Sequence, residues 1–330
     1  LSGMGALPFI LAEDPHLSVT DAVFESVSGL TTTGATVILT LDSLPMSILY
    51  YRQQLQWLGG MGIIVLAVAV LPMLGIGGMQ LYRAETPGPM KDSKLTPRIT
   101  ETAKALWYIY LSLTVACGLA YWLAGMSVFD AVGHAFSTVA IGGFSTHDAS
   151  MGHFNSPLID MIAVVFMFLA AVNFSLHFVA FRHRSVKGYW QDSEFKFYVL
   201  ILSIVILITV LGLYFTETYD TWQDALINGL FQAVSIGTTA GFTTAEFYNW
   251  PGFIAILLLF SSFVGGCAGS TGGGIKVIRF LLLIKQGVRE IARLVHPSAE
   301  IPVKLGTTAV QSRVVEAVWG FFSVYIIVFG

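Results

Sequence analysis

Six stretches of this chain are apolar over roughly the length that a helix needs to cross a lipid bilayer. The hydrocarbon core requires about 20 mostly apolar residues in a helix, and these stretches carry few or no charges. They cover residues 53–71, 104–125, 157–181, 196–216, 251–284 and 312–330. Because helices and closed barrels alone satisfy their backbone groups in lipid, the pattern predicts an all-α integral membrane protein in contact with lipid.

Composition agrees with this prediction and excludes several other classes. Charged residues make up 11% of the 330 residues and hydrophobic ones 55%, whereas soluble domains carry roughly 25% charged residues. A formal net charge of −3 provides no basic surface for nucleic acid. The two cysteines, Cys117 and Cys267, both lie in apolar stretches, which excludes a disulfide framework and a cysteine zinc cluster.

The positive charges predict which side of the membrane each loop faces. Three segments, 83–104, 182–196 and 276–313, hold 16 of the 17 Lys and Arg residues. Since Lys and Arg accumulate in cytoplasmic loops, we expect these segments on the cytoplasmic side and the acid-rich loops outside. The remaining base, Arg52, is expected to be an anchor at the outer interface, with repulsion of ions as the alternative.

Three shorter segments, 20–33, 128–140 and 222–239, are too short to span and end in Thr, Ser and Gly residues. They are copies of one unit: residues 24–34 and 231–241 agree at Phe, Val, Ser, Thr, Thr and Gly without a gap, and 130–143 is a weaker copy. Each copy keeps a spacing of six from a serine to a glycine; the pairs are Ser28 and Gly34, Ser137 and Gly143, and Ser235 and Gly241.

The repeated unit is therefore a spanning outer helix, a re-entrant pore helix with a Thr/Gly strand, and a spanning inner helix. Non-helical backbone survives at membrane depth only where it is buried in protein or lines a water-filled path. The C-terminal end of a short inward-pointing helix is partly negative and favours a cation. Glycine permits bends that turn carbonyl oxygens toward an axis, where they can replace the water around an ion. Three such strands predict one shared pore.

The repeats also predict material missing from both ends. A fourth repeat would begin near residue 312, and its glycine would fall beyond residue 330. Residues 1–11 look like the tail of the first repeat's leading helix. We expect repeat 1 over 1–75, repeat 2 over 76–185, repeat 3 over 186–309 and the start of repeat 4 over 310–330, in a pseudo-fourfold arrangement.

Four segments of the sequence resemble the Trk/Ktr/HKT superfamily of potassium transporters, most closely its TrkH-type members. They are Leu30-Thr-Thr-Thr-Gly-Ala-Thr36, Ala140-Ile-Gly-Gly-Phe-Ser-Thr146, Gly237-Thr-Thr-Ala-Gly-Phe-Thr-Thr244 and Gly265-Gly-Cys-Ala-Gly-Ser-Thr-Gly-Gly-Gly-Ile-Lys276. The resemblance covers essentially the whole chain. It implies potassium uptake, and not an enzymatic activity, through a filter of backbone carbonyls. The implied potassium-binding residues are Thr32, Thr33, Gly34, Ile141, Gly142, Gly143, Thr239, Ala240 and Gly241.

The resemblance carries further implications. Glycine at all three visible filter positions is similar to the potassium-selective type, whereas some plant relatives with serine in the first filter favour sodium. The family implies a homodimer in the bacterial inner membrane, with the filter facing the periplasm. It also implies a cytosolic TrkA-type regulatory ring that carries the nucleotide, so the chain itself is expected to need potassium but no organic cofactor.

The stretch 251–284 is too long for a simple span and is rich in glycine at its middle. Glycine costs about 1 kcal/mol per residue in a helix, so we expect the helix to break near mid-membrane and to form a gate below the filter. The resemblance also implies an intramembrane gating loop here. The alternative is a close-packing glycine face between helices. The predicted loop comprises Gly265, Gly266, Cys267, Ala268, Gly269, Ser270, Thr271, Gly272, Gly273 and Gly274.

Two other functions remain open from the residues. An intramembrane hydrolase would pair Ser137 or Ser270 with His134 or His177, at a hydrogen-bond distance of roughly 2.6–3.2 Å. A secondary transporter of a larger solute would show broken helices in inverted pairs, whereas these repeats share one orientation. Asn173, Ser175 and His177 in the second inner helix are expected mainly to pack against neighbouring helices, with pore lining as the alternative.

Overall fold

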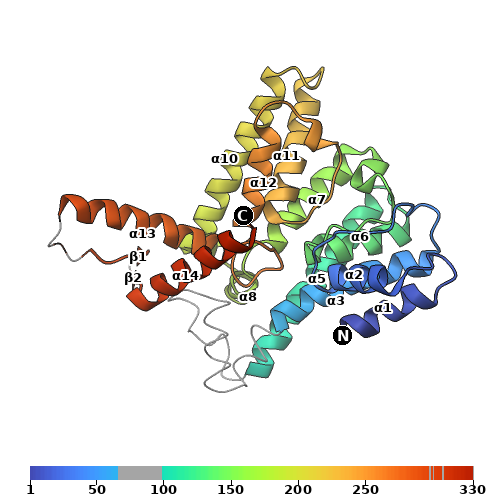
Figure 1. The fold of residues 1–330 in the computed structure, drawn as a ribbon, viewed down its shortest axis with the longest axis horizontal. Helices are drawn as coiled ribbons and strands as arrows, with labels where there is room; N and C mark the ends of the chain where they lie inside the picture. Colours follow the sequence, from blue (N-terminus) through green and yellow to red (C-terminus); the bar gives the residue numbers. More distant parts are fainter. Residues whose placement is uncertain (66–98, 297–298, 300, 307, 330) are drawn as a thin grey trace.

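The computed structural model describes residues 1–65, 99–296, 299, 301–306 and 308–329. This part of the chain is almost entirely helical (Figure 1), which confirms the predicted all-α class. Several predictions lie outside it: the end of the first apolar stretch at 66–71, the boundary between residues 75 and 76, and the four basic residues Arg83, Lys91, Lys94 and Arg98.

The described helices fall into three groups along the chain. The first group is α1 (Ser2–Leu11), α2 (Val19–Leu30) and α3 (Met46–Val65). The second is α5 (Ile99–Leu123), α6 (Val128–Ala140), the 3-10 helix η3 (Ser150–Phe154), α7 (Pro157–Ala170), α8 (Phe174–His183) and the short α9 (Lys187–Gln191). The third is α10 (Ser193–Phe215), α11 (Trp222–Thr238), the 3-10 helix η4 (Phe247–Asn249), α12 (Ile254–Val264) and α13 (Val277–Val295).

A short antiparallel hairpin and one more helix follow. Strand β1 (Lys304–Leu305) pairs with β2 (Thr308–Ala309), and α14 (Ser312–Phe329) comes next. In Figure 1 this hairpin lies beside α13 and α14, away from the short helices α2 and α6. Helices α13 and α14 share a small apolar core that includes Leu282, Val315 and Val318.

By length and composition, two described helices can cross a membrane: Lys104–Leu123 and Ser193–Phe215. The prediction of one continuous span over 157–181 was wrong, because α7 and α8 are bent by 92° at their break. The break falls at Ala171–Asn173, where the Asn173 side chain accepts a hydrogen bond from the N–H of Ser175 at 2.9 Å and caps a new helix. The predicted break in 251–284 is confirmed, since α12 ends at Val264 and α13 begins at Val277.

The largest core lies between the second and third groups of helices. It joins α5, α6 and α7 to α10 and α11 through fully buried side chains, including Tyr110, Tyr121, Met167 and Phe231. A second core packs α1, α2 and α3 around Phe9. The short helices are thus packed into these cores, and the segments that follow α2, α6 and α11 contact one another.

Candidate filter site

Three short helices, α2, α6 and α11, begin with the same cap. The side chains of Ser18, Ser127 and Thr221 each accept a hydrogen bond from the N–H of an aspartate three residues later. Those aspartates are Asp21, Asp130 and Asp224. The cap satisfies a free N–H group at the helix start and places a carboxylate near its partly positive end. The opposite, partly negative end of each helix then leads into the Thr/Gly strand.

The strand leaves each helix through the same hydrogen bond. The N–H of Thr33 donates to the Ser28 carbonyl at 2.9 Å, and Gly142 donates to Ser137 and Ala240 to Ser235 at 2.9 and 2.8 Å. These are the serines of the sequence repeat. The three strands therefore begin with one backbone geometry, although their side chains differ.

Left-handed backbone recurs at two positions in every strand. A residue with positive φ lies one or two residues after each helix: φ is 55° at Thr32, 54° at Ile141 and 73° at Thr239. Two residues later, φ is 78° at Gly34, 79° at Gly143 and 83° at Gly241. L residues rarely adopt these angles and glycine adopts them freely, so the bend requires the glycine of each repeat.

The glycines also pack against the next strand. A Cβ atom on Gly34 would overlap the carbonyl oxygen of Gly142, and one on Gly143 would overlap the carbonyl oxygen of Ala240. A Cβ on Gly241 would meet no atom within 4 Å in the described part of the chain. The strands thus follow one another in the order of the repeats, each glycine against a carbonyl of its neighbour, and the third has an open side.

One of these carbonyls has a side-chain partner. The Gly142 oxygen accepts a hydrogen bond from Gln56 Nε2 at 2.7 Å, and Gln56 Oε1 accepts one from the N–H of Phe144 at 3.1 Å. Gln56 is buried on α3 and spans the second strand on both sides of Gly143. A carbonyl oxygen has two lone pairs, so the Gly142 oxygen keeps one acceptor position.

The glycine-rich stretch 265–274 lies directly beside the ends of the short helices. Thr271 Oγ1 donates to the carbonyl of Val139 in α6 at 2.9 Å, with Ala170 as a second acceptor at 3.2 Å. The N–H of Gly273 donates to Thr239 Oγ1, on the third strand, at 2.7 Å. Gly269 accepts a hydrogen bond from the N–H of Phe174 at 3.0 Å. The loop therefore touches two of the three strand-bearing units.

The same loop is held from the other side by a buried carboxylate. Glu194, in the first turn of α10, accepts hydrogen bonds from the N–H of Ala268 at 2.6 Å and of Ile278 at 3.3 Å. The loop residues Cys267, Ala268, Ser270 and Thr271 are all buried. The ten predicted loop residues thus form one packed segment and not a helical glycine face.

Comparison with known proteins identifies the architecture. The family profile described as "TrkH: Cation transport protein" matches residues 1–330. The chain belongs to the TrkH family. The "Trk system potassium uptake protein TrkH" of Vibrio parahaemolyticus is 63% identical over 331 residues, which cover 100% of this chain and 68% of that protein. The Escherichia coli K12 protein of the same name is 59% identical over 329 residues, with the same coverage.

A solved structure of the TrkH family has the same fold. The "Crystal Structure of the Potassium Transporter TrkH from Vibrio parahaemolyticus" matches with a TM-score of 0.90 at 60% identity, over 100% of this chain and 67% of that one. The predicted resemblance to TrkH-type proteins is confirmed, and with it the assignment to a family of membrane transport proteins without enzymatic function.

The prediction for Arg52 was wrong, because this side chain is fully buried. Its Nε donates to Glu25 Oε1 at 2.7 Å, its Nη1 to the Ser145 carbonyl at 3.2 Å and its Nη2 to Thr36 Oγ1 at 3.1 Å. The guanidinium lies 4.2 Å from the centre of the Phe144 ring. Arg52 is thus bonded to the segments that follow the first and second filter glycines, and its charge is balanced by Glu25.

Glu25 belongs to a set of three equivalent side chains that support the strands. Each lies three residues before the repeat serine; the others are His134 and Gln232. Glu25 accepts hydrogen bonds from Thr36 Oγ1 at 2.9 Å and the N–H of Val37 at 3.1 Å, while His134 Nε2 lies 2.9 Å from Ser145 Oγ. The Gln232 amide, in the orientation that satisfies it, accepts from the N–H of Thr244 at 2.9 Å.

The serine–histidine pairs that a hydrolase would need do not form in the described part of the chain. Ser137 Oγ donates to Gln53, Ser270 Oγ to the Cys267 carbonyl, and His177 bonds to Tyr189 and the Leu169 carbonyl. His134 does meet a serine, Ser145, but both are buried. His177 and Asn173 stabilise the break between α7 and α8, as packing residues would.

Several features of this site were not predicted from the sequence, although signals for them exist. Glu25 and Arg52 are charged residues inside apolar segments, where a charge needs a partner. The Ser/Thr-x-x-Asp pattern at 18–21, 127–130 and 221–224 marks the start of each pore helix. A further group, Asp42 with His147 and His153, draws on two loops that are far apart in sequence.

Proposed function

We propose that this chain carries three quarters of a potassium-selective uptake pathway. The observation that supports the proposal most is the packing of Gly34 against the Gly142 carbonyl and of Gly143 against the Ala240 carbonyl. Strands that follow one another in this way can present carbonyl oxygens to a common axis, and such oxygens replace the water around a dehydrated cation. The names of the two TrkH relatives, both potassium uptake proteins, supply the identity of the ion.

In this proposal the filter residues bind potassium through their backbone oxygens. They are Thr32, Thr33 and Gly34 in the first strand, with their equivalents Ile141 to Gly143 and Thr239 to Gly241. The partly negative ends of α2, α6 and α11 favour the cation. The open side of Gly241 is the place for a fourth strand, from a repeat that begins with α14.

The glycine-rich loop would be the gate. It contacts the third strand through Thr239 and the C-terminal turn of α6 through Val139, so its movement would change the space below the filter. We further propose that the transporter is a homodimer in the bacterial inner membrane with its filter toward the periplasm. A cytosolic TrkA-type ring that binds nucleotide would control the loop through the basic cytoplasmic segments.

Rubidium uptake into proteoliposomes tests the proposal. The full-length protein, reconstituted with its regulatory partner, should take up rubidium, and potassium should compete better than sodium. Gly34→Ser should lose this discrimination, since φ at Gly34 is 78° and a side chain there overlaps the Gly142 carbonyl.

The matched control is Gly188→Ser, because a Cβ at Gly188 meets no atom within 4 Å in the described structure. It should behave as wild type. Size-exclusion profiles confirm that each variant is folded. Wild type without flux of any monovalent cation would refute the pathway, and a folded Gly34→Ser protein with unchanged selectivity would refute the filter.

A further inference from the structure

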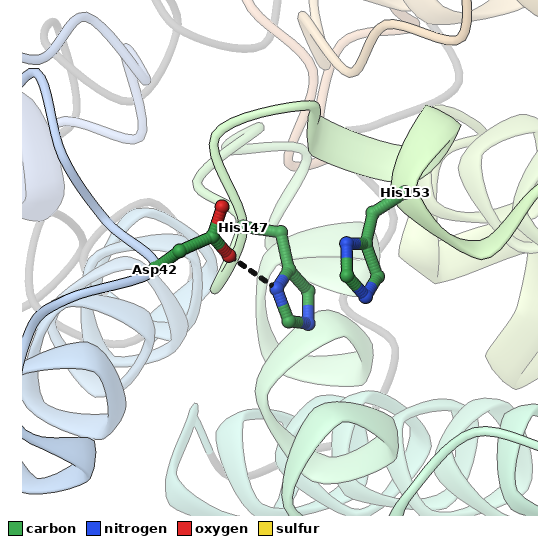
Figure 2. Close-up of side chains that lie close together, drawn as sticks. All are labelled: Asp42, His147 and His153. Atoms are coloured by element: carbon green, nitrogen blue, oxygen red, sulfur yellow. Dashed lines mark hydrogen bonds and ion pairs between the residues drawn. The ribbon is translucent and has the colours of Figure 1, made fainter.

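Three side chains of metal-ligating types meet beyond the filter strands. Asp42 follows the first strand, and His147 and His153 follow the second (Figure 2). One ligand atom of each lies within 4.8 Å of those of the other two. Figure 2 shows that Asp42 comes from a different part of the chain than the two histidines, and that the His147 ring lies between the Asp42 carboxylate and the His153 ring.

Backbone contacts hold the two loops in register. Asp148 Oδ1 accepts a hydrogen bond from the N–H of Leu41 at 2.6 Å, which places Asp42 beside His147. His147 Nδ1 then lies 2.7 Å from Asp42 Oδ1. The juxtaposition of the first and second loops is therefore fixed by the neighbouring residues and does not depend on the cluster itself.

His153 ties the cluster to the third repeat. It lies in η3, where the N–H of Gly152 donates to the Thr243 carbonyl at 3.1 Å. Ser150 Oγ in turn accepts from the N–H of Thr243 at 3.2 Å. Thr243 is two residues after the filter glycine Gly241. An ion shared by Asp42, His147 and His153 would thus link the segments that follow all three filter strands.

The two imidazole rings of His147 and His153 lie face to face. They are 3.5 Å apart between centroids and parallel within 1°, a stacking that repulsion disfavours when both carry a proton charge. His147 Nε2 lies 3.3 Å from Asp130 Oδ1 but makes no hydrogen bond in the described structure, although it is shielded from water. A buried nitrogen without a hydrogen-bond partner destabilises the folded protein, and coordination of a metal ion by that nitrogen would offset part of this cost.

Charge and access also favour a cation. In the described part of the chain, the acidic groups recorded near these rings are Asp42, Asp130 and Asp148, and a further imidazole, His134, lies 6.5 Å from His147 between centroids. The Asp42 side chain is 53% exposed, and His153 is exposed as well. The nearest buried cation, Arg52, is paired with Glu25, and it also donates to the Ser145 carbonyl, two residues before His147.

We propose that Asp42, His147 and His153 bind one divalent cation of the zinc, nickel or cobalt class. Two imidazoles and a carboxylate suit these metals, with water completing the coordination. A metal lies in the plane of each imidazole that binds it, so the parallel rings must tilt toward each other on binding. The site would fasten together the loops of the first and second repeats.

Calorimetric titration of the full-length protein with Zn²⁺ tests this site. Wild type should bind one more zinc ion per subunit than His153→Ala or Asp42→Ala, and His16→Ala, which changes another exposed histidine, should bind as wild type does. His153→Cys replaces one zinc ligand by another, so it should retain the ion. Zinc should also raise the melting temperature of wild type and His153→Cys but not of the two alanine variants at residues 42 and 153.

Equal zinc stoichiometry and affinity in wild type and His153→Ala would overturn the proposal, since the cluster would then be only a hydrogen-bonded contact between loops. Failure of His153→Cys to bind, with a wild-type size-exclusion profile, would also count against it. Binding is measured without any ion flux, so its result does not depend on the proposed transport function.

Discussion

The buried pair of Arg52 and Glu25 allows a quantitative test of how the filter is supported. Both side chains are 0% exposed, and the guanidinium makes three hydrogen bonds, to Glu25, Thr36 and Ser145. Arg52→Met removes the charge and keeps an unbranched side chain of similar reach. Glu25 would then be a buried carboxylate whose described hydrogen-bond partners are Thr36 and Val37.

The expected loss follows from the contacts. Removing one member of a buried ion pair costs about 3–5 kcal/mol, because the other charge is left without compensation. In the double variant Arg52→Met/Glu25→Gln no charge remains, and glutamine is the residue that repeat 3 uses at the equivalent position, Gln232. The double variant loses mainly the hydrogen bonds to Thr36 and Ser145, at about 0.5–1.5 kcal/mol each. It should therefore be about 2 kcal/mol more stable than Arg52→Met alone.

Unfolding of the full-length protein in mixed micelles, followed by tryptophan fluorescence over an SDS titration, measures these differences. The four proteins of the cycle are wild type, the two single variants and the double variant, and the interaction energy is the deviation from additivity. If the two substitutions lower the free energy of unfolding additively in the double variant, Arg52 does not stabilise the protein by neutralising the Glu25 charge, and the reasoning fails.

Four further results are expected. Gly143→Ala should destabilise the protein strongly, because φ at this position is 79° and the new Cβ overlaps the Ala240 carbonyl oxygen. Gly118→Ala is the control, since its new Cβ would meet its nearest neighbouring atom at 3.5 Å, and SDS unfolding compares the two variants. Thr271→Val should raise rubidium uptake about two- to tenfold, the equivalent of one hydrogen bond of about 0.5–1.5 kcal/mol that holds the loop; unchanged uptake by a folded variant would contradict the gate. Ser127→Ala should cost about 1 kcal/mol through the lost cap of α6, while Ser112→Ala, on the exposed part of α5, should cost less in the same unfolding assay. The pKa of Asp42 is lowered from its ordinary value of 3.8, so the ionised carboxylate stabilises the folded protein above about pH 4, and this stabilisation is lost as the pH falls through the folded-state pKa. Asp42→Asn should therefore lower the free energy of unfolding by its full amount above about pH 4 and by less below it. A loss of stability that does not change with pH would contradict this assignment.

The sequence carried most of the information about the backbone of the site. Residues 24–34, 130–143 and 231–241 predicted three short helices followed by glycine-containing strands, because hydrophobic length and the serine–glycine spacing are local properties. The break after Val264 followed from glycine density for the same reason. The bend between α7 and α8 was not predicted, because the segment 157–181 has the length and overall hydropathy of one span. Its break depends on the Asn173 cap and on contacts with the loop at Gly269.

Side-chain pairings were harder to predict because they join distant residues. Arg52 looked like an isolated charge at an interface, yet its partner Glu25 lies 27 residues away and its other contact, Ser145, 93 residues away. Asp42 and His147 are 105 residues apart. Contacts between residues so far apart along the chain produce no repeating pattern in the sequence from which they could be predicted. What the chain does show locally is a charged or polar residue in an apolar segment, which indicates that a partner exists but not where it lies.

The three strands have the same backbone conformation but are supported by chemically different side chains: a carboxylate at Glu25, an imidazole at His134 and an amide at Gln232. A change in pH or in the charge of one supporting side chain therefore affects the three strands unequally. Neutralising Glu25 acts on the first strand directly and on the second through Arg52, which also holds the Ser145 carbonyl. Protonating His134 acts on the second strand, and the third rests on an uncharged amide. If the three strands bind one ion as proposed, each of them can therefore be altered through the side chain that supports it.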